Sequence, residues 1–270
     1  MNTLTQTQVR LLASAQSWIE GEAVRQLYAA SELDGMRLAV GFPDLHPGKG
    51  SPVGAAFVTE DIIYPHLIRG DIGCGMALFK TDLVRREIRL DRWVNLRFEL
   101  EHPRDDYVGS SLAECDLEST DFDASLGTLG GGNHFAELQA VEKVFDADQF
   151  AQLDLGKDQL VVLVHSGSRG LGESILRAHV DQHFGIGVVA DSFAAEEYLS
   201  GHDFAVRWAK VNRELIARRF ASALGAETEP VWDGCHNSIT RVDTGDGAVY
   251  VHRKGAVAAE GEFVVIPGSR

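Results

Sequence analysis

The sequence predicts an α+β protein in which mixed β-sheets form a layered core and helices pack outside them. Short apolar runs, which are typical of strands, alternate with glycine-rich loops along most of the 270 residues. Two segments, 5–33 and 204–224, instead repeat apolar residues at steps of three and four, as amphipathic helices do. Because no internal repeat, low-complexity tract or Pro/Ser linker interrupts the chain, we expect a single domain over 1–270.

The N-terminal half is expected to contain one or two helices followed by several strands. Leu12 and Leu27 lie on the apolar side of the helical segment 5–33. A charged, helical segment is expected over 83–106, and an acidic, solvated loop over 110–123. Short apolar runs between these helices predict strands at 36–42, 54–59, 62–64 and 77–80.

The C-terminal half is expected to contain a buried strand, a long helix and a hairpin. The run LVVLV predicts the strand at 159–164, and the apolar stripe from Phe204 predicts the helix at 204–224. The hairpin is predicted from 248–254 and 263–266. The basic residues of the helix are expected on a solvated face: Arg207, Lys210, Arg213, Arg218 and Arg219. Three histidines on polar stretches receive no role from the sequence: His179, His183 and His202.

Charge and composition narrow the class of protein. The net charge of −15 argues against a broad basic face for nucleic acid, so RNA would be handled in a local pocket, at a strand end. The three cysteines have no paired spacing, which predicts a reducing compartment. The N-terminus lacks a signal-peptide pattern, and no apolar run reaches the roughly 20 residues needed to span a membrane. We expect a cytoplasmic protein.

The segment Gly70-Asp71-Ile72-Gly73-Cys74-Gly75-Met76 is the centre of the predicted site. Its three glycines allow a tight turn and a close approach to a ligand. Asp71 and Cys74 on such a turn can point at one cation, and a hard and a soft ligand together suit zinc, manganese or iron better than calcium.

Further ligand-type residues follow glycine-rich loops or strand ends. His134 ends the run GTLGGGNH, whose backbone N–H groups could meet phosphate, and His165 follows the buried strand. Ser166, Ser168 and Arg169 add an anion-binding set beside His165. Two other loops carry Lys49, between two glycines, and His236, in the run GCHN.

Together these residues predict a metal centre. The candidate ligands are Asp71, Cys74, His134, His165 and His236. Five ligands exceed the three or four that one zinc ion takes from a protein, so a two-metal site with a bridging ligand would use them all. Paired metal ions are a familiar means of clamping phosphoryl oxygens.

Seven segments, in order over about 40–270, resemble the RtcB family of RNA ligases. They are PDLHPGKGSPVGA, GDIGCGM, GTLGGGNHFAEL, HSGSRGLG, CHN, HRKGA and IPGS. Their compact spacing resembles the shorter branch of the family that is associated with peptide chain release factor H.

The resemblance implies an RtcB-like fold and a specific reaction. Such enzymes join an RNA 3′-phosphate or 2′,3′-cyclic phosphate end to a 5′-hydroxyl end, using GTP and two manganese ions. A histidine becomes guanylylated, GMP passes to the RNA 3′-phosphate, and the 5′-hydroxyl displaces it. The implied partners are broken tRNA or rRNA ends, with a functional link to release factor H and no membrane.

The resemblance also implies roles for single residues. The metal ligands are the five already named, and Arg169 and Lys49 would contact anions. The positions that match guanylate contacts of the family are Asn133, Phe135, Glu137, Asn237, Pro267 and Ser269.

One family motif has no counterpart in this sequence. The nucleophilic histidine lies in an SHGAGR-type motif after PGS, and His252 of HRKGA belongs to a different motif, so no catalytic nucleophile is assigned. We therefore expect the chain to lack the family's C-terminal segment, to bind metal, and not to be guanylylated alone. The alternatives are a metal-dependent phosphohydrolase acting on cyclic phosphate ends and an inactive, truncated remnant.

Overall fold

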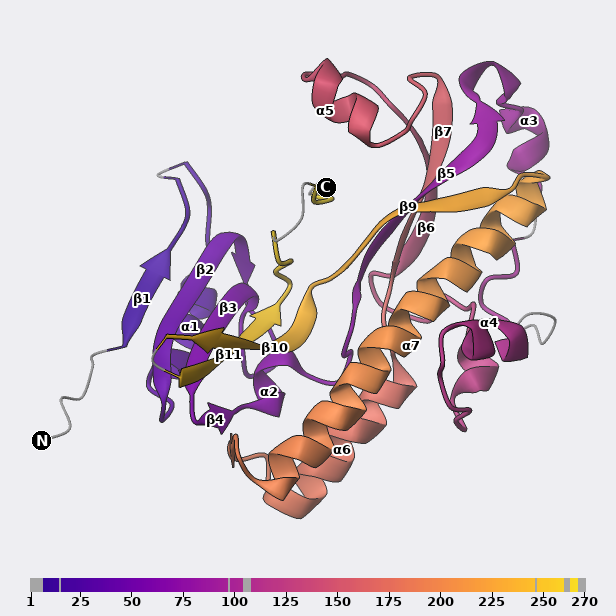
Figure 1. Ribbon diagram of the computed structural model, residues 1–270. Helices are drawn as coiled ribbons and strands as arrows, with labels where there is room; N and C mark the ends of the chain where they lie inside the picture. Colours follow the sequence, from indigo (N-terminus) through magenta and orange to yellow (C-terminus); the bar gives the residue numbers. More distant parts are fainter. Residues whose placement is uncertain are drawn as a thin grey trace, which may run out of the picture. The chain divides into compact units, whose positions relative to one another are not determined.

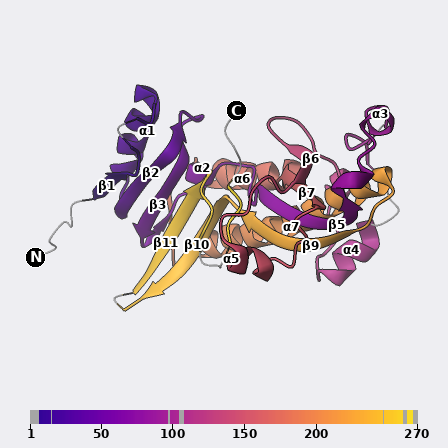
Figure 2. The ribbon, with the colours of Figure 1, turned by 90° about the horizontal axis from the view of Figure 1, so that it is seen from above.

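The computed structural model describes residues 7–14, 16–96, 98–103, 108–245, 247–259 and 263–266. These residues form three β-sheets and seven α-helices (Figure 1), which confirms the α+β class. Neighbouring strands of the two larger sheets run side by side, as the second view also shows (Figure 2). No helix among the described residues is long and apolar enough to cross a membrane.

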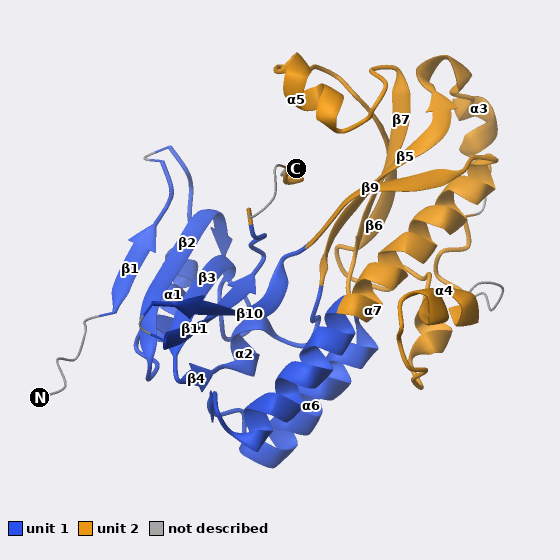
Figure 3. Ribbon diagram, viewed as in Figure 1, with its two compact units in different colours: residues 1–73, 168–206, 235–258 blue, residues 74–167, 207–234, 259–270 orange. Residues whose placement is uncertain are grey.

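The chain forms two compact units, each assembled from separated stretches (Figure 3). Unit 1 comprises 1–73, 168–206 and 235–258, and unit 2 comprises 74–167, 207–234 and 259–270.

Unit 1 is built on a five-stranded sheet covered by one helix. In sheet order its strands are β1 (Gln8–Leu11), β2 (Met36–His46), β3 (Val53–Glu60), β11 (Gly247–Lys254) and β10 (Asn237–Thr244). β1 is parallel to β2, and the other neighbours are antiparallel. Helix α1 (Gly21–Ser31) buries Ala23 and Leu27 in a cluster that includes Phe57 of β3.

Unit 1 also contains a second, smaller sheet, helix α6 and the first part of helix α7. The small sheet pairs β4 (Ile62–Ile63) with β8 (Val188–Val189). Helix α2 (Pro65–Ile68) follows β4, and α6 (Gly170–His183) precedes β8. Helix α7 (Phe193–Leu224) begins in unit 1 and continues into unit 2.

Unit 2 is built on a four-stranded sheet. In sheet order the strands are β6 (Phe135–Ala140), β7 (Gln159–Ser166), β5 (Gly75–Val84) and β9 (Thr228–Cys235). β7 is almost fully buried, because Val162 and Val164 pack against Ile216 and Phe220 of α7. The short helical elements are η1 (Arg85–Glu87), α3 (Leu90–Trp93), α4 (Val108–Glu114), η2 (Asp123–Ser125) and α5 (Ala147–Gln152).

Several expected elements differ from the structure. The segment 5–33 contains strand β1 as well as a helix, because residues 8–11 pair with β2 at the sheet edge. The segment 83–106 is helical only in η1 and α3 among its described residues. Helix α7 begins eleven residues before the predicted Phe204. The partner of β11 in its hairpin is β10, and the described residues 263–266 form no strand.

Candidate metal centre

Three strand ends bring ligand-type side chains together in unit 2. Because β7 runs antiparallel to β5 and β6, its C-terminal end meets their N-terminal ends. His165 of β7 lies opposite Met76 of β5 and Phe135 of β6. Cys74 and His134 directly precede β5 and β6, so the register of one sheet places both beside His165.

The thiol of Cys74 faces both imidazoles. Its Sγ lies 3.5 Å from His134 Nε2 and 3.3 Å from His165 Nε2. Cys74 and His165 are buried, with 5% and 4% of their surface exposed, and His134 is half-buried. We call these three residues the Cys74 cluster.

Backbone carbonyls hold the other side of each ring. His134 Nδ1 lies 3.0 Å from the Leu129 carbonyl, and His165 Nδ1 lies 3.0 Å from the Asn133 carbonyl. Since a carbonyl only accepts, Nδ1 carries a hydrogen in both rings, and Nε2 is the nitrogen that faces Cys74. Metal-binding histidines are usually fixed in this way.

The spacing of each Cys74–imidazole pair fits a shared bound ion. With a thiolate at about 2.3 Å and an imidazole at about 2.0–2.1 Å from tetrahedral zinc, sulfur and nitrogen lie roughly 3.5 Å apart. The observed separations of 3.5 and 3.3 Å are close to that value. A thiolate with an imidazole suits zinc, iron or another borderline divalent ion.

Helix α7 supports the loops that carry the cluster, through two residues to which the sequence gave no role in the site. The Asn212 amide accepts from the Gly127 N–H at 2.8 Å and donates to Ser166 Oγ at 3.1 Å. Arg213 donates to the Ser166 carbonyl at 2.9 Å and forms two 2.7 Å bonds to the Asp233 carboxylate. Both α7 side chains are fully buried, so the solvated face predicted for Arg213 is wrong.

The remaining two predicted ligands, Asp71 and His236, belong to unit 1. Asp71 Oδ1 accepts from the Arg169 backbone N–H at 2.9 Å. The Asp71 carbonyl accepts from the Asn237 amide at 3.2 Å, and Gly73 N–H donates to the Asn237 carbonyl at 2.8 Å. The loop end before Cys74 is therefore tied to the segment that carries His236.

Glycine is required where this loop meets the first turn of α6. A Cβ on Gly172 would lie 2.3 Å from the Gly70 carbonyl oxygen, and a Cβ on Gly70 would meet the Glu173 side chain. Arg169, just before α6, has a left-handed φ of 53°, which is uncommon for a side chain of its size. The conformation of the loop around Asp71 thus depends on residues outside it.

Each predicted ligand belongs to a group of side chains that could hold a metal ion. The residues in those groups are Asp71, Cys74, His134, His165 and His236.

The positions matched to guanylate contacts lie in different surroundings. Asn133 is exposed, and the Phe135 ring stands edge-on to His165 with centroids 5.5 Å apart. Glu137 is half-buried and accepts from Gln139. The buried Asn237 amide contacts the backbone at Asp71 and Gly255. Pro267 and Ser269 lie outside the described residues.

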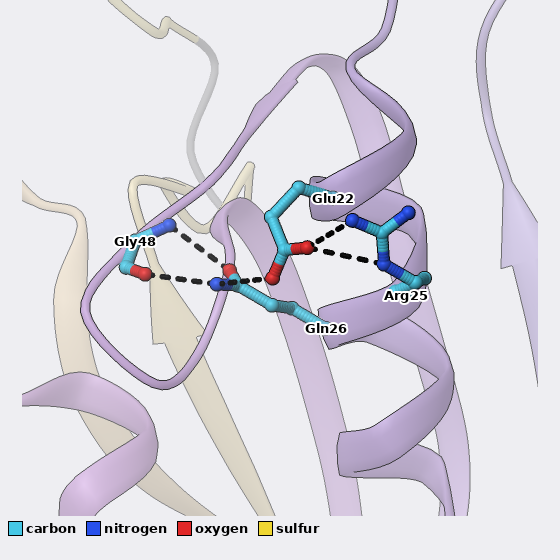
Figure 4. Close-up of polar contacts among 4 residues, drawn as sticks. All are labelled: Glu22, Arg25, Gln26 and Gly48. Carbon is cyan, nitrogen blue, oxygen red and sulfur yellow. Dashed lines mark hydrogen bonds and ion pairs between the residues drawn. The ribbon is translucent and has the colours of Figure 1, made fainter.

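The loop that carries Lys49 is anchored to α1 (Figure 4). The Gln26 side chain donates to the Gly48 carbonyl at 2.9 Å and accepts from the Gly48 N–H at 3.0 Å. Glu22, paired with Arg25, also accepts from the Gln26 amide. Lys49 itself is exposed, so its ammonium group is accessible to an anion from solvent.

Comparison with known proteins identifies close and distant relatives. The family described as "tRNA-splicing ligase RtcB" matches this chain over residues 26–124 and 113–270. RNA-splicing ligase RtcB2 of Escherichia coli is 42% identical over 263 residues, which cover 96% of this chain and 68% of that protein.

More distant relatives align with this chain over similar fractions of both sequences. RNA-splicing ligase RtcB of Mycobacterium tuberculosis is 29% identical, over 87% of this chain and 74% of its own. The tRNA-splicing ligase RtcB of Thermococcus kodakarensis is 27% identical, over 86% of this chain and 67% of its own.

Proposed function

Because this chain belongs to the RtcB family of RNA ligases, we propose that it repairs RNA in the cytoplasm with GTP and manganese. The proposed reaction joins a 3′-phosphate or 2′,3′-cyclic phosphate end to a 5′-hydroxyl end. Its class, RNA ligase, follows from the family and from relatives named RNA-splicing or tRNA-splicing ligases.

The observation that carries this proposal is the Cys74 cluster. The Cys74 thiol lies at one sheet edge beside two imidazoles whose Nδ1 atoms are held by backbone carbonyls, and each sulfur–nitrogen separation suits a shared divalent ion. A bound ion would neutralise phosphate charge and polarise the phosphoryl group at an RNA end.

We further propose that Asp71 and His236 complete a centre for two manganese ions. Asp71 lies three residues before Cys74 on the same loop, and its carboxylate is the harder ligand that manganese favours. The backbone bond from Arg169 orients that carboxylate, while the amide of Asn237 fixes the peptide that follows it.

The GTP contacts are proposed at the positions that the family motif marks. Asn133 and Phe135 flank the ligand His134, so a guanylate held by them would be adjacent to the metal cluster in sequence and in the sheet. Glu137 lies on the same strand, two residues further. Asn237, Pro267 and Ser269 are the remaining proposed contacts, and Lys49 and Arg169 would contact anionic groups of GTP or RNA.

The RNA substrate would be recognised mainly at its ends. A net charge of −15 disfavours a long phosphate track, whereas a metal pocket can hold one terminal phosphate. Broken tRNA or rRNA supplies such ends, and a functional link to peptide chain release factor H is proposed on the family resemblance.

A ligation assay tests the proposal. The full chain is incubated with GTP, manganese and an RNA pair that carries a 2′,3′-cyclic phosphate and a 5′-hydroxyl. We expect this chain alone to bind metal without being guanylylated, and a joined product that requires GTP only when a polypeptide with the family's SHGAGR-type motif is added. The Cys74→Ala variant should give no product under either condition. A cyclic phosphate that is opened without GTP and never joined would instead identify a metal-dependent phosphohydrolase.

A further inference from the structure

The segment that joins α6 to α7, within unit 1, exposes large apolar side chains that have no role in the proposed reaction (Figure 1). Phe184 and Phe193 are 85% and 79% exposed, so these two rings alone present roughly 300 Å² of apolar surface. Ile186 and Val189 lie between them in sequence and are also exposed. Single apolar side chains are normal on a protein surface, but several hundred Å² in one short segment indicates an interaction site. We call these four residues the apolar loop.

The rest of unit 1 holds the apolar loop in one conformation. β8 pairs with β4, so Val188 is buried while Val189, the next residue of the strand, is exposed on the opposite side. The buried ring of His179 makes a hydrogen bond to the backbone of Ile186. A surface whose backbone is already fixed loses little conformational entropy when a partner binds to it.

The backbone of Phe184 adopts a conformation that is costly for a bulky residue. Phe184 follows the last residue of α6 with a left-handed φ of 56°, which side chains of its size rarely adopt. The N–H of Ile186 closes this turn by donating to the His183 carbonyl at 3.1 Å. Local strain of this kind is concentrated at functional sites, and here it accompanies a ring that unit 1 leaves in solvent. A partner that buries the ring would account for both features.

Exposed carboxylates flank the apolar loop. Residues 178–206 contain neither lysine nor arginine, and they carry five carboxylates, all exposed: Asp181, Asp191, Glu196, Glu197 and Asp203. The exposed residue Asp61 also lies beside the loop, because its carbonyl accepts from the Ala190 N–H at 2.8 Å. Such a surface repels nucleic acid and anionic membranes, and a second copy docked by the same face would set carboxylates against carboxylates. Charge complementarity therefore favours a cationic partner.

A pocket next to the apolar loop suits a cationic side chain. It lies between α6 and the first part of α7, has a volume of about 200 Å³, and is lined by His183, which directly precedes Phe184. Aliphatic side chains and hydrogen-bond acceptors also line it: Ile175, Ala178, His179, Gln182, Glu197 and Tyr198. Nε2 of His179 and the Tyr198 hydroxyl are buried without a hydrogen-bond partner among the described residues. The stem of a lysine or arginine would lie against the aliphatic residues, and its head group would donate to the acceptors.

We propose that the apolar loop and its flanking carboxylates form a docking surface for a basic, amphipathic segment of a partner protein. The apolar side chains of that segment would cover Phe184 and Phe193. Its lysines or arginines would pair with the carboxylates, and one of them would enter the pocket. The surface includes none of the residues proposed to bind metal, GTP or RNA, so docking there does not depend on the RNA ligase activity.

Peptide selection on the full chain tests the proposal. A phage library displays random peptides of about 16 residues, enough for roughly four helical turns. Soluble Phe184→Ser/Phe193→Ser variant is added in excess, so that peptides binding elsewhere are removed. We expect the selected peptides to combine large apolar residues with lysine or arginine. By fluorescence anisotropy, a synthetic peptide of their consensus should bind this variant at least about thirtyfold more weakly than the original chain, because buried aromatic anchors dominate interface energies.

The matched control is Phe145→Ser, at an equally exposed phenylalanine of unit 2, which should leave the affinity unchanged. A second variant, Asp191→Asn/Glu196→Gln, should weaken binding by about threefold at low salt and flatten its salt dependence. The proposal is overturned if no peptide is enriched, if the enriched peptides are acidic or uncharged, or if the charge variant keeps the original salt dependence. An equal loss in Phe145→Ser overturns it, as does a dimer of the full chain that the Phe184→Ser/Phe193→Ser variant abolishes.

Discussion

The Cys74 cluster of unit 2 and the histidine pair of α6 in unit 1 hold a ring in the same way but differ in what the ring faces. A backbone group engages one nitrogen of His134, His165 and His179, while Nε2 of His134 and of His165 contacts the Cys74 thiol. The cluster joins residues 60 and 91 positions apart through a sheet register, whereas His179 and His183 are one helical turn apart. The comparison teaches that a held and buried ring is not by itself a metal site, because the Cys74 cluster also brings a thiol to its rings.

The largest expected effect is on the RNA ligation rate, and it distinguishes Cys74 of the cluster from His183 of α6. Cys74→Ala should lower the ligation rate by about a thousandfold or more, because a lost ion removes several kcal/mol of charge stabilisation. His183→Gln should change that rate by less than about threefold, because His183 is not among the proposed metal ligands or GTP contacts. Single-turnover ligation of a cyclic-phosphate RNA, with the polypeptide that carries the SHGAGR-type motif present, measures both rates. Equal losses in the two variants would contradict the role of Cys74.

The second effect concerns the helix that supports the Cys74 cluster. Arg213→Met should destabilise the protein by about 3 kcal/mol or more, because it leaves the Asp233 carboxylate without its buried partner. Arg218→Met removes an exposed pair with Glu214 on the same helix and should cost at most about 0.5 kcal/mol. Urea unfolding compares the two variants, and similar midpoints would contradict the structural role of Arg213.

The third effect sharpens the role of α6. Gly172→Ala should cost about 1–3 kcal/mol, because its Cβ would collide with the Gly70 carbonyl beside Asp71. Gly109→Ala in α4 has no atom within 4 Å of the new Cβ, so it should be neutral or stabilising by up to about 1 kcal/mol. Thermal unfolding distinguishes the pair, and a neutral Gly172→Ala would show that the loop relaxes freely.

The smallest effect concerns a buried histidine of unit 1 that is not among the proposed metal ligands. His252 is fully buried, accepts from the Tyr64 N–H at 2.9 Å, and has its pKa lowered by burial to about 3. Below about pH 6.5 the unfolded chain takes up a proton that the folded chain refuses, so stability falls as pH decreases toward 3.

The expected slope from this residue is about 1.4 kcal/mol per pH unit within that window. Denaturant unfolding at about pH 7.5, 6.5 and 5.5 measures it. His252→Gln retains an acceptor for the Tyr64 N–H but cannot titrate, so its profile should be flatter. An equally steep profile would assign the acid sensitivity to other groups.

The strands and the ligand-bearing loops could be predicted from the sequence because their signals are local. The apolar run LVVLV predicts β7 whatever surrounds it, and glycines beside Asp71 and Cys74 mark a tight loop. The edge strand β1 could not be predicted from its own sequence pattern. It is a strand because it pairs with β2 through backbone hydrogen bonds.

By itself the sequence determined the α+β class and the family, and it nominated candidate metal ligands, since side-chain chemistry and short-range periodicity are properties of the chain. Only the tertiary structure decided which nitrogen of His165 faces Cys74, that Arg213 is buried, and that His179 borders a pocket. Those properties depend on carbonyls and helices distant in sequence, and no local pattern encodes their positions.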